Sequence, residues 1–372
     1  MTLYLINIAI TWVVAAYVTR SREHAILAGR KLKLYEEWVP WAIILLSWCF
    51  LYAFRGTTGT DTGGYYRSFK SAAAALTMKG HVSYKRDQIF YIVQYFLAKL
   101  FRGRWVPACA IFSLIVYTPI LITIRKKSVD VVVACLMFIF CMAYTFGFNG
   151  MRQGLSCGLA TMAYFLFLRE KRYVLYTIFI LLAAGFHSAT FLIIPLQFVT
   201  FCKFSEKRTI AIVLVSIVFY MYMVQLWGGA MDVLEAVGQE KMAKDYAGYA
   251  FKRGSSIIRT LAMLVPTAVA IYKRHEIKAR FPDFDQDLWL ILIGFLFIML
   301  SMKFVYSARI AAYFSTCSIV YMPKLTYAFG QRMRYRFTQA ILWAFFFYML
   351  LLMLHGDSQL YPYVPAWESG RW

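Results

Sequence analysis

Apolar runs of roughly 15 to 20 residues recur along the whole chain, and they constrain its fold more than any other feature. A helix needs about 20 apolar residues to cross a bilayer, so such runs predict transmembrane helices. Strands of a membrane barrel alternate apolar and polar residues, which these runs do not. With 61% hydrophobic and 16% charged residues, the composition also excludes a soluble enzyme. The sequence predicts an all-α, polytopic integral membrane protein, with residues 1–372 as one transmembrane domain.

The net charge of +22 is explained by membrane topology rather than by nucleic-acid binding. The basic residues form short clusters between apolar runs, where lysine and arginine hold loops on the cytoplasmic side and contact anionic lipids. All seven cysteines lie within apolar runs and form no CxxC pair, which is typical of core residues. We therefore expect contacts with membrane lipids and no nucleic acid, metal or cofactor.

Basic loops set the orientation of the predicted helices. No basic residue precedes the first run, Leu3–Val18, and Arg20 and Arg22 follow it, so its N-terminus is predicted outside. The later short basic loops are predicted inside, at 125–127, 169–172, 203–208, 273–280 and 332–336. Helices then alternate without conflict at 40–54, 105–124, 129–147, 154–168, 173–186, 188–202, 209–227, 257–272, 288–302, 310–328 and 338–354. The predicted total is about twelve membrane-spanning helices, with both termini outside.

One apolar run is too short for a crossing. Ile89–Phe101 has 13 residues, and its polar positions recur on one helical face, at Gln88, Tyr91, Tyr95, Lys99 and Arg102. We predict an interfacial or re-entrant helix there. Three long outer segments follow from this topology, 55–104, 228–256 and the tail 355–372, and function is expected on this face.

The most unusual stretch is residues 55–67, here called the Gly-Thr segment, which follows a predicted helix directly. Its glycines permit a tight backbone whose exposed N–H groups can bind anionic oxygens. Arg55 and Arg67 add positive charge, Asp61 is its one carboxylate, and Tyr65 and Tyr66 offer flat faces to a sugar or a prenyl chain. The alternative is an ordinary glycine-rich turn in which Asp61 only accepts backbone hydrogen bonds.

Further polar residues are predicted at the same outer level. Asn149, Arg152 and Gln153 stand between two apolar runs, where an arginine is costly unless it meets an anion or a wet cavity. His187 lies in a break between helices, although a lone histidine is more often structural. Basic residues join them at Arg253, Arg259 and Arg309. Together they favour an anionic ligand at the outer leaflet boundary, and a lipid-linked diphosphate has that chemistry.

These motifs carry a resemblance to a known family. The pattern Arg55, Gly59-Thr60-Asp61 and Tyr65 resembles the Arg, Gly-Thr-Asp and Tyr signature of EpsG-like proteins, a family of Wzy-type polymerases of bacterial surface polysaccharides. Arg152-Gln153 is similar to that family's Arg-Gln helix start, and Phe186-His187-Ser188-Ala189 to its Phe-His-x-Ala segment. Thr62 departs from the aromatic residue expected after the aspartate.

The resemblance implies a membrane glycosyltransferase of the bacterial inner membrane. It would join oligosaccharide repeat units carried on undecaprenyl diphosphate into an O-antigen-type polysaccharide at the periplasmic face, where both termini would lie. Such a step needs a base for the attacking hydroxyl and cations for the leaving diphosphate. We expect Asp61 to act as the general base or to orient the acceptor hydroxyl, and Arg55, Arg152 and His187 also to take part in catalysis. Substrate binding is expected from Tyr65, Tyr66, Arg67, Asn149, Gln153, Arg253, Arg259 and Arg309. A chain-length regulator and a flippase of the same pathway are possible partners.

Three other functions remain open on the sequence alone. A flippase or other transporter would place its charges along a central path and show two related halves, whereas the unusual charges here gather at one level. A membrane O-acyltransferase would act through His187 with a partner acid. A polysaccharide ligase would differ mainly in its acceptor.

Overall fold

The computed structural model describes residues 1–83, 86–236 and 256–371, and in this part of the chain all regular elements are helices. Its contacts divide the chain into two compact units. Unit 1 comprises Met1–Phe191, Thr316–Thr326 and Gly330–Trp372, and unit 2 comprises Leu192–Ser315 and Tyr327–Phe329. The prediction of an all-helical fold, consistent with a polytopic membrane protein, is confirmed.

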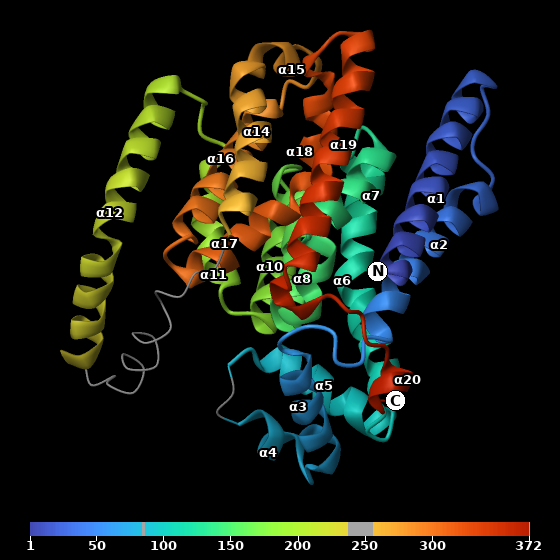
Figure 1. Ribbon diagram of the computed structural model, residues 1–372, viewed down its shortest axis with the longest axis vertical. Helices are drawn as coiled ribbons and strands as arrows, with labels where there is room; N and C mark the ends of the chain where they lie inside the picture. The colour runs from blue at the N-terminus through green and yellow to red at the C-terminus, as the bar shows by residue number, and fades with distance from the viewer. Residues whose placement is uncertain (84–85, 237–255, 372) are drawn as a thin grey trace. The chain divides into compact units, whose positions relative to one another are not determined.

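Unit 1 holds the N-terminal helices and the last long helix (Figure 1). Its helices are α1 (Thr2–Leu27), α2 (Leu34–Ala53), α3 (Thr62–Ala74), α4 (Met78–Val82), α5 (Gln88–Leu100), α6 (Trp105–Lys127), α7 (Val131–Phe140), α8 (Ala143–Asn149), α9 (Met151–Ala163), α10 (Tyr173–Phe186), α18 (Ser318–Leu325), α19 (Gln331–Leu354) and α20 (Ala366–Ser369). A π-helical turn, Tyr164–Leu168, extends α9, and a 3₁₀ turn, Asp357–Gln359, follows α19.

The core of unit 1 forms around α6, which packs against α2 and α9. A buried aromatic cluster ties α2, α6 and α8 together: the ring of Trp48 lies 5.8 Å from Tyr117 and 5.9 Å from Tyr144. The buried hydroxyl of Tyr144 donates to the Trp48 carbonyl at 2.9 Å, so the polar atom is satisfied inside the apolar core. A Cβ on Gly158 of α9 would lie 2.5 Å from the Val116 carbonyl oxygen of α6. Glycine therefore permits this close helix approach.

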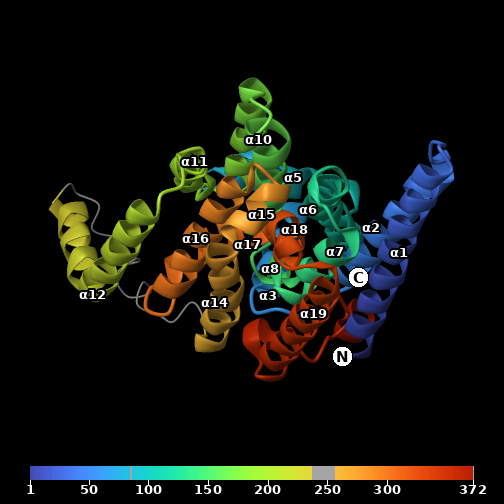
Figure 2. The same cartoon turned by 90° about the horizontal axis from the view of Figure 1, so that it is seen from above.

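Three short helices form one end of unit 1. In Figure 1, α3, α4 and α5 lie together below the long helix α6, and α5 packs against α3, α4 and α10. With 13 residues, α5 is short for a span of about 20, and its buried face includes Phe90, Gln94 and Leu97. The short helix predicted at 89–101 is thus present, while its interfacial placement stays a prediction. Seen from above, α1 and α2 run side by side at the edge of unit 1 (Figure 2).

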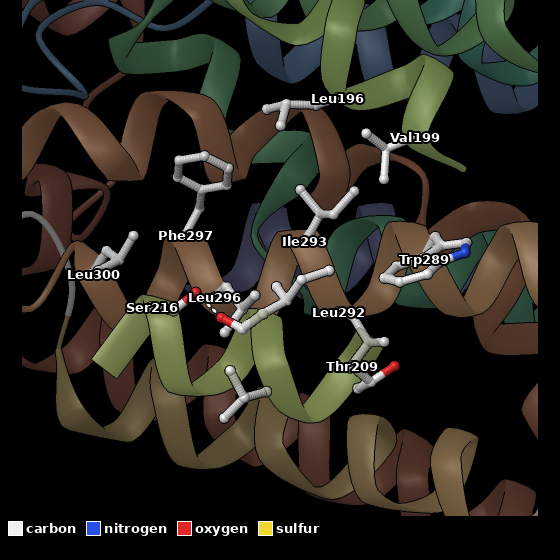
Figure 3. A pocket seen from close by; sticks show the side chains of 12 residues that line it. Leu196, Val199, Thr209, Ser216, Trp289, Leu292, Ile293, Leu296, Phe297 and Leu300 are labelled. Atoms are coloured by element: carbon white, nitrogen blue, oxygen red, sulfur yellow. Dashed lines mark hydrogen bonds between the residues drawn. The ribbon is translucent and has the colours of Figure 1, made fainter. Parts of the chain in front are cut away.

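Unit 2 contains α11 (Thr190–Val199, whose first two residues belong to unit 1), α12 (Glu206–Ala236), α14 (Ile257–Tyr272), α15 (Arg274–Arg280), α16 (Phe284–Leu300) and α17 (Val305–Thr316). A 3₁₀ turn, Thr326–Ala328, follows α18. An apolar cavity of about 250 Å³ lies among α11, α12 and α16 (Figure 3). Trp289, Phe297 and Leu300 line it, and the hydroxyl of Ser216 is turned to the carbonyl of Ile212 at 2.8 Å. Such a lining suits hydrocarbon.

The predicted number of membrane crossings is not confirmed. The described residues form a helix in each predicted range, but six helical stretches are long and apolar enough to cross a membrane. These six are Thr2–Leu27, Leu34–Ala53, Trp105–Lys127, Val131–Asn149, Glu206–Val233 and Gln331–Leu354. Three others are apolar but shorter, at Tyr173–Phe186, Thr190–Val199 and Ile257–Tyr272. Several predicted runs form helices that are shorter than the roughly 20 residues of a full crossing, so counting runs gives a larger number.

The placement of α5 is tested by introducing single cysteines on either side of it. Ser71 in α3 and Arg104 after α5 are exposed and lie on either side of α5 in the sequence. Ser71→Cys and Arg104→Cys should therefore both react with an impermeant thiol reagent in intact cells. Lys126→Cys, at the exposed end of α6, should react only after permeabilisation. Protection of residue 104 in intact cells would show that α5 crosses the membrane and would reverse the orientation of the chain after it.

Candidate functional site

A buried carboxylate brings three segments of unit 1 together. Asp87 Oδ2 accepts a hydrogen bond from Arg152 Nη1 at 2.8 Å and lies 3.3 Å from His187 Nδ1. Its other oxygen, Oδ1, accepts from the backbone N–H of Ser188 at 2.8 Å. Asp87 precedes α5, Arg152 lies in the first turn of α9, and His187 and Ser188 follow α10. We call Asp87, Arg152 and His187 the Asp87 cluster.

Asp87 is held in a conformation that few residues tolerate. Its φ of 59° is left-handed, a region in which aspartate is enriched among non-glycine residues. It occupies the N-cap position of α5, yet its side chain makes no cap hydrogen bond and is turned to the Asp87 cluster. The side chain is only 4% exposed. Burial raises the pKa of the carboxyl, but hydrogen bonds from His187 and Ser188 and the charge of Arg152 outweigh it and hold the pKa below its usual value.

The ring of His187 is fixed on one side and unpartnered on the other. The backbone carbonyl of His187 accepts from the hydroxyl of Thr190 at 2.7 Å, and Thr190 in turn contacts Ser156 of α9. Nδ1 faces Asp87, and Nε2 is buried without a hydrogen-bond partner in the described part of the chain. An unpartnered ring nitrogen beside a bound carboxylate is a typical arrangement for proton transfer.

Arg152 connects the Asp87 cluster to the Gly-Thr segment. Its side chain is 32% exposed, and its guanidinium lies 5.9 Å from the ring centre of Tyr91 on α5. Tyr65 of α3 adjoins it: burial raises the pKa of the Tyr65 hydroxyl, while the charge and hydrogen bond of Arg152 partly oppose that rise. Asp61 raises the same pKa further, so its charge also reaches Tyr65. Asp61 is exposed and makes no side-chain cap bond at the start of α3.

The described part of the tail, residues 355–371, folds back onto the Gly-Thr segment. Arg55 and Pro365 form an isolated antiparallel bridge, and Gly56 N–H donates to the Val364 carbonyl at 2.8 Å. The backbone N–H of Gly59 donates to the Gln359 carbonyl at 2.9 Å. The tail thus accepts hydrogen bonds from the Gly56 and Gly59 N–H groups, which belong to the backbone that the sequence analysis expected to bind an anion.

Side chains from both sides secure this contact. Thr58 Oγ1 accepts from the Val364 N–H at 2.8 Å, and Arg371 donates to the Gly56 carbonyl at 3.0 Å. Asn149 donates to the Ser358 carbonyl at 3.1 Å, while its side-chain oxygen is buried without a partner in the described residues. Gly59 has a φ of +97°, and a Cβ there would lie 2.6 Å from that oxygen. Asn149 therefore holds the tail and lies against Gly59 of the Gly-Thr segment.

Arg55 makes its contacts with residues outside the Asp87 cluster. It is fully buried, donates to the Tyr52 carbonyl, and stacks with its guanidinium 3.7 Å from the Tyr52 ring centre. The ring of Phe148 lies at 5.4 Å. Its Nε and Nη2 have no hydrogen-bond partner in the described residues. In this conformation the Arg55 side chain anchors the first residue of the Gly-Thr segment to the end of α2.

The remaining predicted residues are dispersed. Tyr66 packs edge-on against Trp105 at 5.9 Å and carries Arg371 over its ring at 4.9 Å; Arg67 is exposed and Gln153 is buried. Arg253 lies outside the described residues. Arg259 and Arg309 belong to α14 and α17 of unit 2, where Arg309 lies 5.2 Å from the Tyr306 ring centre.

Asp87 itself was not among the residues predicted from the sequence. It stands between a basic stretch and the predicted helix 89–101, where it reads as a simple N-cap. One signal was available: residues 55–104 contain only two acidic residues, Asp61 and Asp87. In a segment so rich in arginine and lysine, an acidic residue is expected to pair with a cation.

The chain matches the model of a known protein family. The model of the EpsG family matches residues 38–364, nearly the whole chain. The match spans the Gly-Thr segment, the Asp87 cluster and most of the tail. A search of curated proteins found no match, and neither did a search of solved structures.

Proposed function

The chain belongs to the EpsG family of polysaccharide polymerase-like membrane proteins, and from this premise we propose that it joins lipid-linked oligosaccharide repeat units into a surface polysaccharide. The observation that carries the proposal is the Asp87 cluster, in which a partly exposed arginine and a histidine with an unpartnered nitrogen share one buried carboxylate. A cation and a proton acceptor side by side suit the transfer of a glycan from a diphosphate leaving group.

The proposed reaction transfers a glycan between two lipid carriers. A sugar hydroxyl at the non-reducing end of one repeat unit attacks the anomeric carbon of a second glycan on undecaprenyl diphosphate. A new glycosidic bond forms, the bond between the anomeric carbon and the diphosphate oxygen breaks, and its electron pair leaves with the diphosphate. The hydroxyl proton passes to a base. We place this step at the periplasmic face of a bacterial inner membrane.

Each part of the site has a proposed task. Arg152 binds the diphosphate and stabilises the charge that develops on it, since its guanidinium has five N–H donors and Asp87 occupies only part of them. Tyr65 adjoins Arg152, and the charge of the exposed Asp61 reaches Tyr65, so both residues would hold the acceptor sugar. Tyr66 and Arg67, on the same helix, would contact the rest of the glycan.

The polyprenyl chains need an apolar surface. Unit 1 has a cavity of about 320 Å³ among α1, α7 and α19, lined by Trp12, Phe140 and Trp343 among others. None of the proposed site residues lines this cavity or the cavity of unit 2. Both are suited to hydrocarbon chains, whereas the polar chemistry belongs to the Asp87 cluster.

A deletion strain tests the proposed function. Without the protein, lipid-linked single repeat units should accumulate, surface glycan should be limited to single-repeat caps, and the ladder of longer chains should vanish on a gel. Complementation with the full chain should restore the ladder. Complete absence of surface glycan would instead support a flippase or a ligase, and an intact ladder would rule out a polymerase.

A further inference from the structure

The carboxylate of Asp87 receives more donors than a simple ion pair requires. Arg152 Nη1 and the Ser188 N–H donate to its two oxygens, and His187 Nδ1 lies beside the oxygen that Arg152 also contacts. An ionised carboxylate accepts hydrogen bonds and donates none, so the neutral ring of His187 can bond to it only with a proton on Nδ1. That tautomer leaves the lone pair on Nε2, the buried nitrogen without a partner.

We propose that Asp87 is a positioning residue that holds His187 in the tautomer with a free Nε2 lone pair, so that His187, and not Asp61, takes the proton of the acceptor hydroxyl. This inference rests on the proposed function. It assigns Asp87 a part that the sequence motifs do not show. It also replaces Asp61 as the base, while leaving Asp61 its contact with the acceptor sugar.

The chemistry of the two candidate bases favours His187. Histidine is the side chain that most often serves as a general base, and the tautomer of His187 is fixed by Asp87. Asp87 also orders the ring at Nδ1, and Thr190 fixes the backbone of His187 by donating to its carbonyl. Asp61 is exposed and has no side-chain cap bond to fix it.

The local backbone supports a positioning role. Asp87 has a positive φ and its side chain makes no cap bond to α5, both of which disfavour the fold. In exchange, its side chain joins the starts of α5 and α9 to the end of α10. Such local strain is typical of residues retained for function.

Asparagine cannot replace this carboxylate. If its amide oxygen faces Arg152 and His187, its NH₂ group meets the Ser188 N–H, which is also a donor. If the amide is turned, the NH₂ group faces Arg152 and donates to Nδ1, which moves the ring proton to Nε2. Either way, one donor loses its acceptor, and the second orientation removes the lone pair from Nε2.

The test compares turnover with donor binding in purified protein. The probe is the lipid-linked repeat unit extracted from the deletion strain. We expect Asp87→Asn to lower kcat by about 10² to 10⁴, as loss of an aspartate that orients a catalytic histidine does elsewhere. Binding of the probe should persist, because Arg152 is still present. Asp130→Asn is the matched control: Asp130 caps α7 by accepting from the Val133 N–H at 3.0 Å, asparagine caps equally well, and kcat should not change.

Two further variants keep the test decisive if Asp87→Asn folds poorly. His187→Gln cannot accept the proton and should lose kcat to the same extent with Asp87 intact. Asp87→Glu keeps an acceptor-only group and should recover part of the turnover lost in Asp87→Asn. The inference is overturned if Asp87→Asn or His187→Gln keeps wild-type kcat. If the wild-type protein makes no polymer from the probe, the proposed function fails instead.

Discussion

Replacement of Arg152 by lysine should abolish most polymerisation, with kcat/KM lowered by about 100-fold or more, nearly as far as with alanine. Arg152 already donates through Nη1 to Asp87, and a planar guanidinium still has other N–H groups to offer a diphosphate in a fixed fork. A lysine ammonium is a single point charge that would stay with the buried carboxylate. Rates should be measured on lipid-linked repeat units with purified protein in bilayers.

The control for this prediction is Arg20→Lys, at an exposed position of α1, which should polymerise at the wild-type rate. Arg152→Lys should also weaken binding of the lipid-linked donor, in contrast to Asp87→Asn. If Arg152→Lys retained the normal rate, positive charge alone would suffice and the bidentate contact would be excluded.

Replacement of Gly56 by alanine should displace the tail and remove most activity. A Cβ at residue 56 would lie 2.6 Å from the Pro365 carbonyl oxygen and 2.1 Å from Ser369 Oγ. The serine can rotate, but the carbonyl is part of the backbone. It accepts from the Glu368 and Ser369 N–H groups, and Pro365 is held by the bridge to Arg55, so its movement would disturb the tail. We expect a destabilisation of about 1–3 kcal/mol, typical of overpacking. Thermal unfolding and limited proteolysis of the tail, alongside polymer yield, measure the effect.

Gly64→Ala is the matched control in the same segment. A Cβ there meets nothing within 4 Å, and the residue lies inside α3. Alanine is favoured over glycine in a helix by about 1 kcal/mol, so stability should be kept or raised. A tail that remained protected from protease in Gly56→Ala, with normal polymer yield, would show that the bridge is dispensable.

The helices were predictable because hydrophobic periodicity is a local signal. Each predicted range contains a helix in the described residues, and the short helix at 89–101 was recognised from its length and its polar face. Arg152 and His187 were also identified, since an arginine and a histidine at the ends of apolar runs are conspicuous in a membrane protein.

Asp87 was missed because its role depends on contacts across the chain. Its partners Arg152 and His187 are 65 and 100 residues away, and nothing in the local sequence indicates that they meet. The Gly-Thr segment shows the same limit. Its exposed N–H groups suggested an anion, but the tail supplies carbonyls for Gly56 and Gly59 from about 300 residues further on. Local patterns indicate which groups need partners, and only the fold shows what those partners are.

The docking of the tail also governs when the site is completed during synthesis. Thr58 is translated 306 residues before its partner Val364, an interval of about 15 to 60 seconds at ordinary rates of elongation. Until then, Gly56 and Gly59 have none of their tail acceptors, whereas all three residues of the Asp87 cluster already exist once residue 187 has been made. A chain whose synthesis ends before residue 358 therefore contains the Asp87 cluster but lacks the tail carbonyls that bind the Gly-Thr segment. Only chains translated beyond residue 358 can therefore form the ordered Gly-Thr segment.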